Sequence, residues 1–361
     1  MSILKKILVI FFLSLPISNI FVQNAHANFI SSGDTLSTSN YEIRRFDTSA
    51  QTTDPRDITF SNDGKKMFTI EQGTKSAFEY ILSTPYNIST ATFVQSFSLS
   101  DETTRPFKIK FNTNGSKMFI VGRTARKVFE YSLSTNFDIS STSVTYTGNF
   151  IDVSSQVDAN TLFGLAFSPD GLKMFITENG FGLHQYSLNK SFDLSGGANF
   201  IRSAEVPTLL NGTQYNGIVF NQSGTRLFMV DSLINAVNQY TLSEGFNIAT
   251  ASFDGGGRDT ETDASSIDFS PSGLKMYVAG IDDLVKEYHL PCPFNLFAGK
   301  CSPIAENKDR TGIAMAQIEI AKRTIDYSTD TALNRLKWIR RNKDKQNLTN
   351  LNINFNFTNQ R

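Results

Sequence analysis

The sequence predicts an all-β fold, a five-bladed β-propeller of four-stranded antiparallel blades. The first observation behind this prediction is a nine-residue pattern that occurs five times, roughly 50 residues apart. The copies begin at Phe60, Phe111, Phe167, Phe220 and Phe269. The second observation is a glycine at the fifth position of every copy, between two apolar runs, which is typical of a tight turn between strands. Several short strands per unit at a regular period are typical of propeller blades.

The first unit illustrates the four strands that each unit is expected to form. Residues 58–60 alternate apolar and polar, residues 61–64 form the turn, and residues 67–70 return. Residues 78–82 form a third strand and residues 92–97 a fourth, outer strand. Each unit also carries a tyrosine in its third strand and then an aromatic–polar–aliphatic step. The tyrosines are Tyr80, Tyr131, Tyr186, Tyr240 and Tyr288, and the steps begin at Tyr86, Phe137, Phe192, Phe246 and Phe294. The repeated Phe and Met side chains are expected to fill the space between blades.

The ring is expected to close through an N-terminal strand. Residues 41–46 precede the first repeat as the outer strand at residues 94–99 precedes the second, whereas the fifth repeat ends near Phe294 without an outer strand. An open array would leave unpaired strand edges, which favour edge-to-edge pairing between molecules. We therefore expect residues 41–296 to form the propeller, with the first strand completing the last blade.

The turn residues resemble those of a known group of propellers. Residues 167–171 are Phe-Ser-Pro-Asp-Gly, and the other copies are variants of this turn. The pattern resembles the bacterial extracytoplasmic β-propeller repeat proteins of the TolB-like and YVTN-like group over residues 41–296. This resemblance implies the propeller fold. It implies no activity, because propellers host binding modules, hydrolases and lyases alike.

The N-terminus predicts export from the cytoplasm. Residues 1–27 resemble a signal peptide, with Lys5 and Lys6 before a short apolar core and Ala25-His26-Ala27 at the expected cleavage point. Residues 28–40 form a flexible Ser/Thr/Asn/Gly-rich segment. We therefore expect a secreted, cell-surface or periplasmic protein, and an uncleaved membrane anchor is the alternative.

In an exported chain, the even pair of Cys292 and Cys301 is a candidate disulfide, with two free thiols as the alternative. It would close a short loop where the propeller ends.

A basic tail follows the propeller at residues 297–361. Its spacing of apolar residues predicts short helices over residues 312–325 and from about residue 331, and the rest is expected to be disordered. The simpler interpretation of this tail is a solvated linker, and the alternative is a segment that contacts an anionic envelope surface. Residues 320–323, 334–341 and 347–355 resemble the linker that precedes the membrane barrel of bacterial autotransporters, although no barrel follows here.

The charge balance and the absence of several motifs argue against some classes of function. The 34 basic and 34 acidic residues balance, so no overall positive field favours binding to nucleic acid. The protein is expected to be a monomer. The sequence contains no His-Glu-x-x-His, Gly-x-Ser-x-Gly or Walker pattern.

Two positions of the innermost strands are expected to approach the central channel. One position carries Asp57 and Lys108, and the other carries Lys110 and Asp268; these four are the predicted ligand contacts. A structural Asp57–Lys108 ion pair is the alternative. A basic residue recurs in every second strand and is expected to be solvated at a blade edge, with a basic ligand ring as the alternative. These residues are Lys66, Lys117, Lys173, Arg226 and Lys275.

The loop at residues 254–263 is the candidate metal site. Its acids are Asp254, Asp259, Glu261 and Asp263. Ca²⁺ favours such oxygen clusters, but the spacing does not match an EF-hand, and a long inter-blade loop explains the segment equally well. No other cofactor is expected.

We expect a binding or interaction module without catalysis that recognises a glycan, a polymer or an envelope protein. Recognition would use the loops of one propeller face, since four of these differ between copies while the strands do not. One alternative is a periplasmic or extracellular hydrolase or lactonase with its site in the central channel. Another is a structural passenger of the autotransporter type.

Overall fold

The computed structural model describes residues 42–103, 105–158, 160–179, 182–205, 214–259, 264–290 and 292–297. The predicted signal peptide (residues 1–27), the segment 28–40, the tail from residue 298 and Cys301 lie outside these residues. The predictions on them therefore remain predictions.

Five sheets of four antiparallel strands form the described part of the chain. The first three blades are β2 (Pro55–Phe60), β3 (Lys66–Glu71), β4 (Ser76–Leu82) and β5 (Ala91–Ser98); β6 (Pro106–Phe111), β7 (Lys117–Gly122), β8 (Lys127–Leu133) and β9 (Val144–Asp152); and β10 (Leu162–Phe167), β11 (Lys173–Glu178), β12 (Gly182–Leu188) and β13 (Ala198–Glu205). The fourth is β14 (Tyr215–Phe220), β15 (Arg226–Asp231), β16 (Ala236–Leu242) and β17 (Ala251–Asp259). The fifth is β18 (Ala264–Phe269), β19 (Lys275–Gly280), β20 (Leu284–His289) and β1 (Glu42–Asp47).

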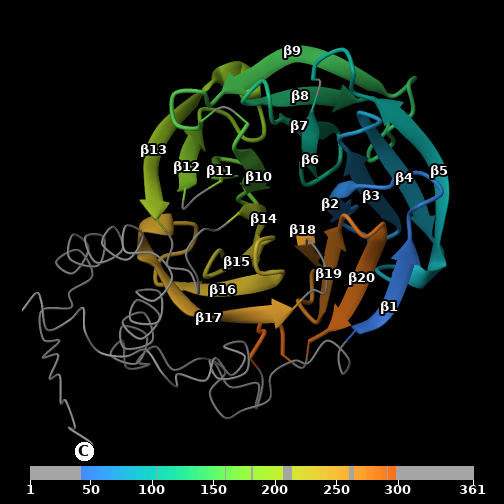
Figure 1. Ribbon diagram of the computed structural model, residues 1–361. Coiled ribbons are helices and arrows are strands. Elements are labelled where there is room, and N and C mark those ends of the chain that lie inside the picture. The colour runs from blue at the N-terminus through green and yellow to red at the C-terminus, as the bar shows by residue number, and fades with distance from the viewer. Residues whose placement is uncertain are drawn as a thin grey trace, which may run out of the picture. The chain divides into compact units, whose positions relative to one another are not determined.

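The arrangement is a closed five-bladed propeller, as the sequence predicts (Figure 1). The strands β2, β6, β10, β14 and β18 lie nearest the centre, and the fourth strand of each sheet lies outermost. The strand β1 pairs antiparallel with β20, with Arg44 opposite Glu287 and Phe46 opposite Val285. The N-terminal strand thus completes the last blade, and the closure prediction is confirmed.

Each repeat glycine is required by an aromatic ring that lies against it. Gly171 has φ +67°, and a Cβ placed there would lie 2.0 Å from the ring of Phe192. Phe192 itself adopts φ +49°, unusual for a non-glycine residue, and its N–H donates to the Gly171 carbonyl at 3.0 Å. The same hydrogen bond joins the corresponding aromatic residue and glycine in the other four blades. The aromatic–polar–aliphatic step is therefore the partner of the turn.

Aromatic pairs fill the five interfaces between blades. In each, the aromatic side chain of a second strand packs on the repeat phenylalanine of the next blade, with ring centroids 4.5–4.8 Å apart. The pairs are Phe68–Phe111, Phe119–Phe167, Phe175–Phe220, Phe228–Phe269 and Tyr277–Phe60. The last pair joins the fifth blade to the first, so the closing interface uses the same contact as the others.

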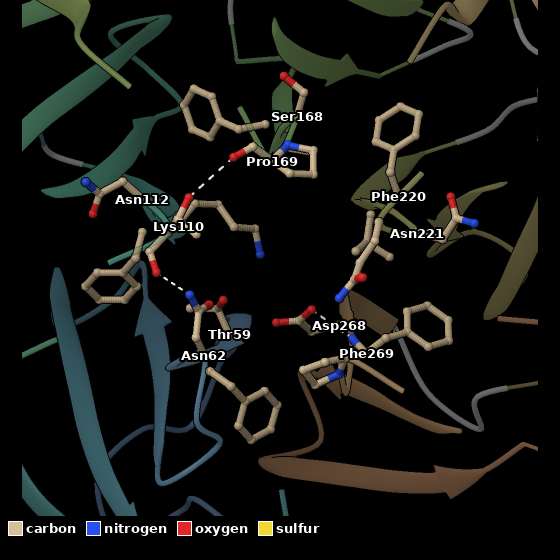
Figure 2. Close-up of a pocket in the computed structure, with 18 of the residues that line it drawn as sticks. Thr59, Asn62, Lys110, Asn112, Ser168, Pro169, Phe220, Asn221, Asp268 and Phe269 are labelled. Carbon is tan, nitrogen blue, oxygen red and sulfur yellow. Dashed lines mark hydrogen bonds between the residues drawn. The ribbon is translucent and has the colours of Figure 1, made fainter. Parts of the chain in front are cut away.

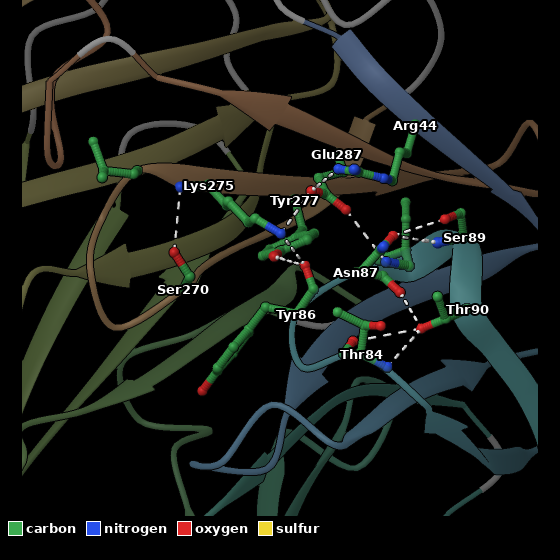
Figure 3. A network of polar contacts seen from close by, with 12 residues as sticks. Arg44, Thr84, Tyr86, Asn87, Ser89, Thr90, Ser270, Lys275, Tyr277 and Glu287 are labelled. Carbon is green, nitrogen blue, oxygen red and sulfur yellow. Dashed lines mark hydrogen bonds and ion pairs between the residues drawn. The ribbon is translucent and has the colours of Figure 1, made fainter.

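A buried polar contact, here called the inter-blade clamp, also recurs at every interface. A Glu or Gln of each third strand accepts a hydrogen bond from a backbone N–H of the next blade. The pairs are Glu79–Ile139, Glu130–Leu194, Gln185–Ile248, Gln239–Leu296 and Glu287–Ile88, at 2.7–3.3 Å. The closing clamp appears in Figure 3, where Glu287 also receives Arg44 at 2.8 Å and Lys275 at 3.0 Å. This Glu therefore joins the N-terminal strand, the fifth blade and the first.

The recurring basic residues contact neighbouring groups, which corrects the expectation that they are solvated. Three of them, Lys66, Lys117 and Lys275, belong to this clamp. Lys66 pairs with Glu79 at 2.7 Å and donates to the Phe137 carbonyl of the next blade at 2.6 Å. Lys275 makes the equivalent bond to the Tyr86 carbonyl at 2.7 Å. In these three blades the cause is the buried Glu on the neighbouring strand, which attracts the ammonium inward. Neither Lys66 nor Lys275 lines a basic ligand ring.

The helices among the described residues are short 3-10 turns that begin at the last residue of an aromatic–polar–aliphatic step, such as Ile88–Thr90 and Ile248–Thr250. No described helix has the length and apolar character needed to cross a membrane.

Candidate functional site

The central channel opens into a hollow of about 700 Å³ at one end of the propeller. Each innermost strand runs toward this end and leads into its repeat turn, so we call it the turn face and the opposite end the loop face. The residues that follow the repeat phenylalanines line the rim, and side chains of the innermost strands form the floor (Figure 2).

The floor is polar on one side and apolar on the other. It consists of Thr59, Lys110, Ala166, Val219 and Asp268, one residue from each blade. Because ring closure makes the first, second and fifth blades neighbours, the three polar residues are adjacent. In Figure 2, Lys110 and Asp268 point into the hollow from different strands, while Phe220 and Phe269 point away from it.

Asp268 lies among groups that raise and lower its pKa. Burial raises the pKa of Asp268 to about 6, although the nearby Lys110 ammonium and the Phe269 N–H, which donates at 2.8 Å, oppose this shift. The carboxylate is consequently charged at neutral pH and becomes a hydrogen-bond donor only in mildly acidic solution.

Lys110 links the floor to a buried carboxylate below it. Its Nζ lies 3.1 Å from Oδ2 of Asp57. Asp57 is only 1% exposed and also accepts hydrogen bonds from the Ile109 N–H at 2.9 Å and from the Ser266 hydroxyl. These partners come from the second and fifth blades, so Asp57 on β2 joins three blades beneath the floor.

Lys108 is also sealed inside the propeller. It is 1% exposed, and its Nζ donates to the carbonyl of Arg56 and, at 2.8 Å, to that of Ser265. Its Nζ lies 4.0 Å from Asp57, and burial lowers the pKa of Lys108 to about 7 even though Asp57 opposes the shift. Of the four predicted ligand contacts, Lys110 and Asp268 line the hollow, and Asp57 and Lys108 contact protein atoms below it.

The rim comes from the third position of the repeat turn, which differs in chemistry between the copies. Its residues are Asn62, Thr113, Pro169, Gln222 and Pro271. Two contacts connect neighbouring turns: Asn62 donates to the Thr113 carbonyl, and the Thr113 hydroxyl donates to the Pro169 carbonyl at 3.4 Å. Sequence reasoning missed these residues, and the signal that could have found them is that this position varies more than the small polar residues on either side of it.

The variable loops lie at the other end of the molecule. Asp101 and Asp158 belong to loops that lead into β6 and β10, so they lie at the loop face. The hollow and these loops thus occupy opposite ends of the propeller.

The predicted metal site is only partly described. Asp254 lies on β17, where its Oδ2 accepts from Gln239 at 2.9 Å and Thr241 at 2.7 Å and faces Arg226 at 3.6 Å. The expected loop is therefore strand up to Asp259, because β17 continues its pairing with β16 past a bulge. The Asp259 side chain, Glu261 and Asp263 lie outside what the structure describes. Within the described side chains, no group of three His, Cys, Asp or Glu could hold a metal.

Cys292 is 3% exposed at the end of the propeller. Its predicted partner, Cys301, lies outside the described residues, so the disulfide remains a prediction.

No protein-family model and no curated protein matches this chain. Solved structures resemble it distantly. A candidate 6-phosphogluconolactonase from Bacteroides uniformis is 13% identical with a TM-score of 0.39, over 63% of this chain and 64% of that one. Another from Bacteroides fragilis is 13% identical with a TM-score of 0.39, over 59% and 56%. The propeller domain of Cps50 (Swd1) from Myceliophteria thermophila is 6% identical with a TM-score of 0.41, over 65% and 97%. This chain thus spans less than two thirds of the Bacteroides proteins, and these distant likenesses assign no ligand and no reaction.

Proposed function

We propose that the protein is a secreted or cell-surface binding module without catalysis, which receives the terminal unit of a glycan in the turn-face hollow. The observation that carries this proposal is the two-sided floor. Thr59, Lys110 and Asp268 offer donors and acceptors on one side, while Ala166 and Val219 offer an apolar surface on the other.

A sugar ring matches such a floor. Its hydroxyl groups both donate and accept hydrogen bonds, as a neighbouring carboxylate, ammonium and hydroxyl require. Its C–H face can lie on Ala166 and Val219 without leaving polar groups unpaired. A hollow of about 700 Å³ is in the size range of small-ligand sites.

The absence of catalysis in this proposal rests on the channel positions of the innermost strands. These strands carry two carboxylates, Asp57 and Asp268. Asp57 is bound by residues of the second and fifth blades, which leaves Asp268 as the carboxylate that faces the hollow. Hydrolysis by paired carboxylates needs a second one in reach of the same bond.

The predicted signal peptide and the predicted Cys292–Cys301 disulfide support the extracytoplasmic part of the proposal. Fractionation of cells that express the full chain, with mass spectrometry of its N-terminus and of the cysteine pair, tests that part. We expect a mature terminus at Asn28 and an oxidised pair. An intact N-terminus in the membrane pellet would indicate the anchor, and a reduced pair in the cytosol would contradict export.

A glycan array tests the ligand. We expect the protein to bind a subset of glycans, and Ala166→Trp to abolish binding because the indole fills the apolar side of the floor. The matched control is Leu233→Trp, since Leu233 is 58% exposed at the loop face. Binding should also weaken as the pH falls through about 6, where Asp268 takes up a proton.

Three outcomes would contradict the glycan proposal. Binding that survives Ala166→Trp would place the ligand elsewhere. An array without signal, followed by capture of an envelope protein that Ala166→Trp prevents, would keep the hollow and change the ligand class. Turnover of any bound glycan would show a catalytic protein.

A further inference from the structure

Three arginines gather at the loop face, on the opposite side of the propeller from the hollow. Arg56 lies in β2, Arg105 directly precedes β6, and Arg123 directly follows β7. The last two are held together by a backbone hydrogen bond from the Arg123 N–H to the Arg105 carbonyl at 3.0 Å. Asn160 joins them again, because Arg123 Nε donates to its carbonyl at 2.8 Å and Arg105 to its side chain at 3.4 Å.

Two buried phenylalanines form a platform under these arginines. Phe107 and Phe163 are both 0% exposed and meet edge to face at 5.1 Å. The Arg123 guanidinium carbon lies 4.2 Å from the Phe163 ring centroid and 5.2 Å from that of Phe107, and the Arg56 carbon lies 5.5 Å from Phe107. Stacking on a ring occupies the flat face of a guanidinium and leaves its N–H edges free to bind.

The positive charge of this cluster is only partly compensated. Arg56 pairs with Asp54 at 2.6 Å. Neither Arg105 nor Arg123 has an ion pair among the described residues, and the one hydrogen bond that the Arg123 side chain donates to them comes from Nε. Burial, and after it the neighbouring charges of Arg105 and Arg56, lower the pKa of Arg123 to about 10.

We propose that this cluster is a binding site for a tetrahedral oxyanion, a phosphate that is free or esterified. Two uncompensated guanidiniums match the charge of a phosphate dianion, and their N–H pairs match its oxygens in bidentate geometry. A single carboxylate would neutralise only one of the two charges.

The site is independent of the proposed glycan site. Arg56 lies at the start of β2 and Thr59 near its end, and the buried Asp57 lies between them in the chain. A phosphate at the loop face therefore contacts none of the residues that line the hollow.

Calorimetric titration of the full chain with inorganic phosphate, glycerol 1-phosphate and acetate tests the proposal. We expect both phosphates to bind, acetate to bind at least about tenfold more weakly, and added salt to weaken binding. The double variant Arg105→Gln/Arg123→Gln should lose tenfold or more in affinity for phosphate, since charge-assisted hydrogen bonds are the strong ones. The matched control, Lys65→Gln/Lys190→Gln, removes two exposed charges from the turn face and should bind as the parent does.

The outcomes separate the sources of the ligand. Tighter binding of glycerol 1-phosphate indicates an ester, and tighter binding of the inorganic ion indicates free phosphate; both support the site. Equal binding of acetate and phosphate, or equal weakening by the control, would overturn it in favour of a diffuse positive potential. If the double variant unfolds at a lower temperature than the parent, the single Arg105→Gln change decides, because Arg105 makes one side-chain hydrogen bond at 3.4 Å.

Discussion

At the scale of single residues, the repeat is a set of steric pairs. Gly171 and Phe192 are separated in sequence but depend on each other. The Phe192 ring occupies the space where a Cβ of residue 171 would lie, and the turn requires φ +67° at the same residue. The same pairing in all blades explains why the glycine recurs while the residue two places before it does not. The variable residue faces the rim of the hollow, where no ring constrains it.

The cost of this pairing can be measured with two glycines of similar backbone conformation. Gly148 has φ +81° and nothing within 4 Å of the position that a Cβ would take, whereas a Cβ at Gly171 would meet the Phe192 ring. We expect both Gly→Ala changes to suffer the positive-φ penalty of about 1 kcal/mol. Gly171→Ala should lose about 1–3 kcal/mol more, because the ring must move.

Denaturant unfolding of the two variants and the parent gives this difference directly. Equal losses at Gly148 and Gly171 would contradict the steric account and leave backbone conformation as the whole reason for the repeat glycine. Unfolding midpoints should be compared at constant m-value, since a change in m would mean that the unfolded or native ensemble had altered as well.

At the scale of elements, each third strand carries an acceptor that the next blade needs. The aliphatic residue of each aromatic–polar–aliphatic step has its backbone N–H inside the interface, and an unpaired buried N–H is costly. Glu79, Glu130, Gln185, Gln239 and Glu287 solve this in the same way. Both Glu and Gln serve, so the accepting oxygen is what all five interfaces share.

This leads to a prediction at the closing clamp. Glu287→Gln should cost less than about 1.5 kcal/mol, since the amide oxygen can still accept the Ile88 N–H as it does in two other blades. Glu287→Ala should cost about 3 kcal/mol, because it leaves that N–H, Lys275 and Arg44 without their shared partner. Thermal or denaturant unfolding measures both, and a Gln variant as unstable as the Ala variant would mean that charge, and not the hydrogen bond, holds the interface.

The clamp also shows what could not be predicted from the sequence. The Glu or Gln stands directly before every repeat tyrosine, so its position was visible. In a sheet with one wet face, a polar residue beside a buried tyrosine points to solvent. In a propeller both faces of a blade pack on neighbours, so simple alternation would place these Glu and Gln residues in solvent. The same reasoning gave the wrong expectation for the recurring basic residues. The strand order and the closure were predictable because turns and outer strands are local signals.

The sequence predicts which strand positions face the channel, but not which of their side chains reach the hollow. Alignment of the repeats placed Asp57, Lys108, Lys110 and Asp268 on channel-facing strands. Which of them reach the hollow depends on side-chain packing across three blades, as the contacts of Asp57 show. The prediction of a loop after Asp254 was wrong for a different reason. Three successive glycines locally disfavour a strand, yet β17 extends through them. The Phe297 ring covers Gly255.

At the scale of the whole molecule, stability depends on a closed ring of equivalent interfaces. The aromatic pairs and the clamps occur five times, including at the junction of the first and fifth blades. An opened ring would lose one of these interfaces and expose strand edges at the same time. The N-terminal strand β1 supplies the closing sheet edge, and its Phe46 ring packs on Tyr80 of the first blade at 5.3 Å.

Removal of β1 should therefore destabilise the whole propeller and not only its last blade. A chain that begins at Thr48 leaves the N–H and C=O groups of β20 that pair with β1 without partners and removes Arg44 from Glu287. We expect it to unfold at a lower temperature than a chain that begins at Tyr41, and to associate through the exposed edge of β20. Calorimetry and size-exclusion chromatography of the two chains measure these effects. If both are monomers with the same unfolding temperature, the fifth blade is complete with three strands, and the force that closes the ring lies in the inner strands and their aromatic pairs.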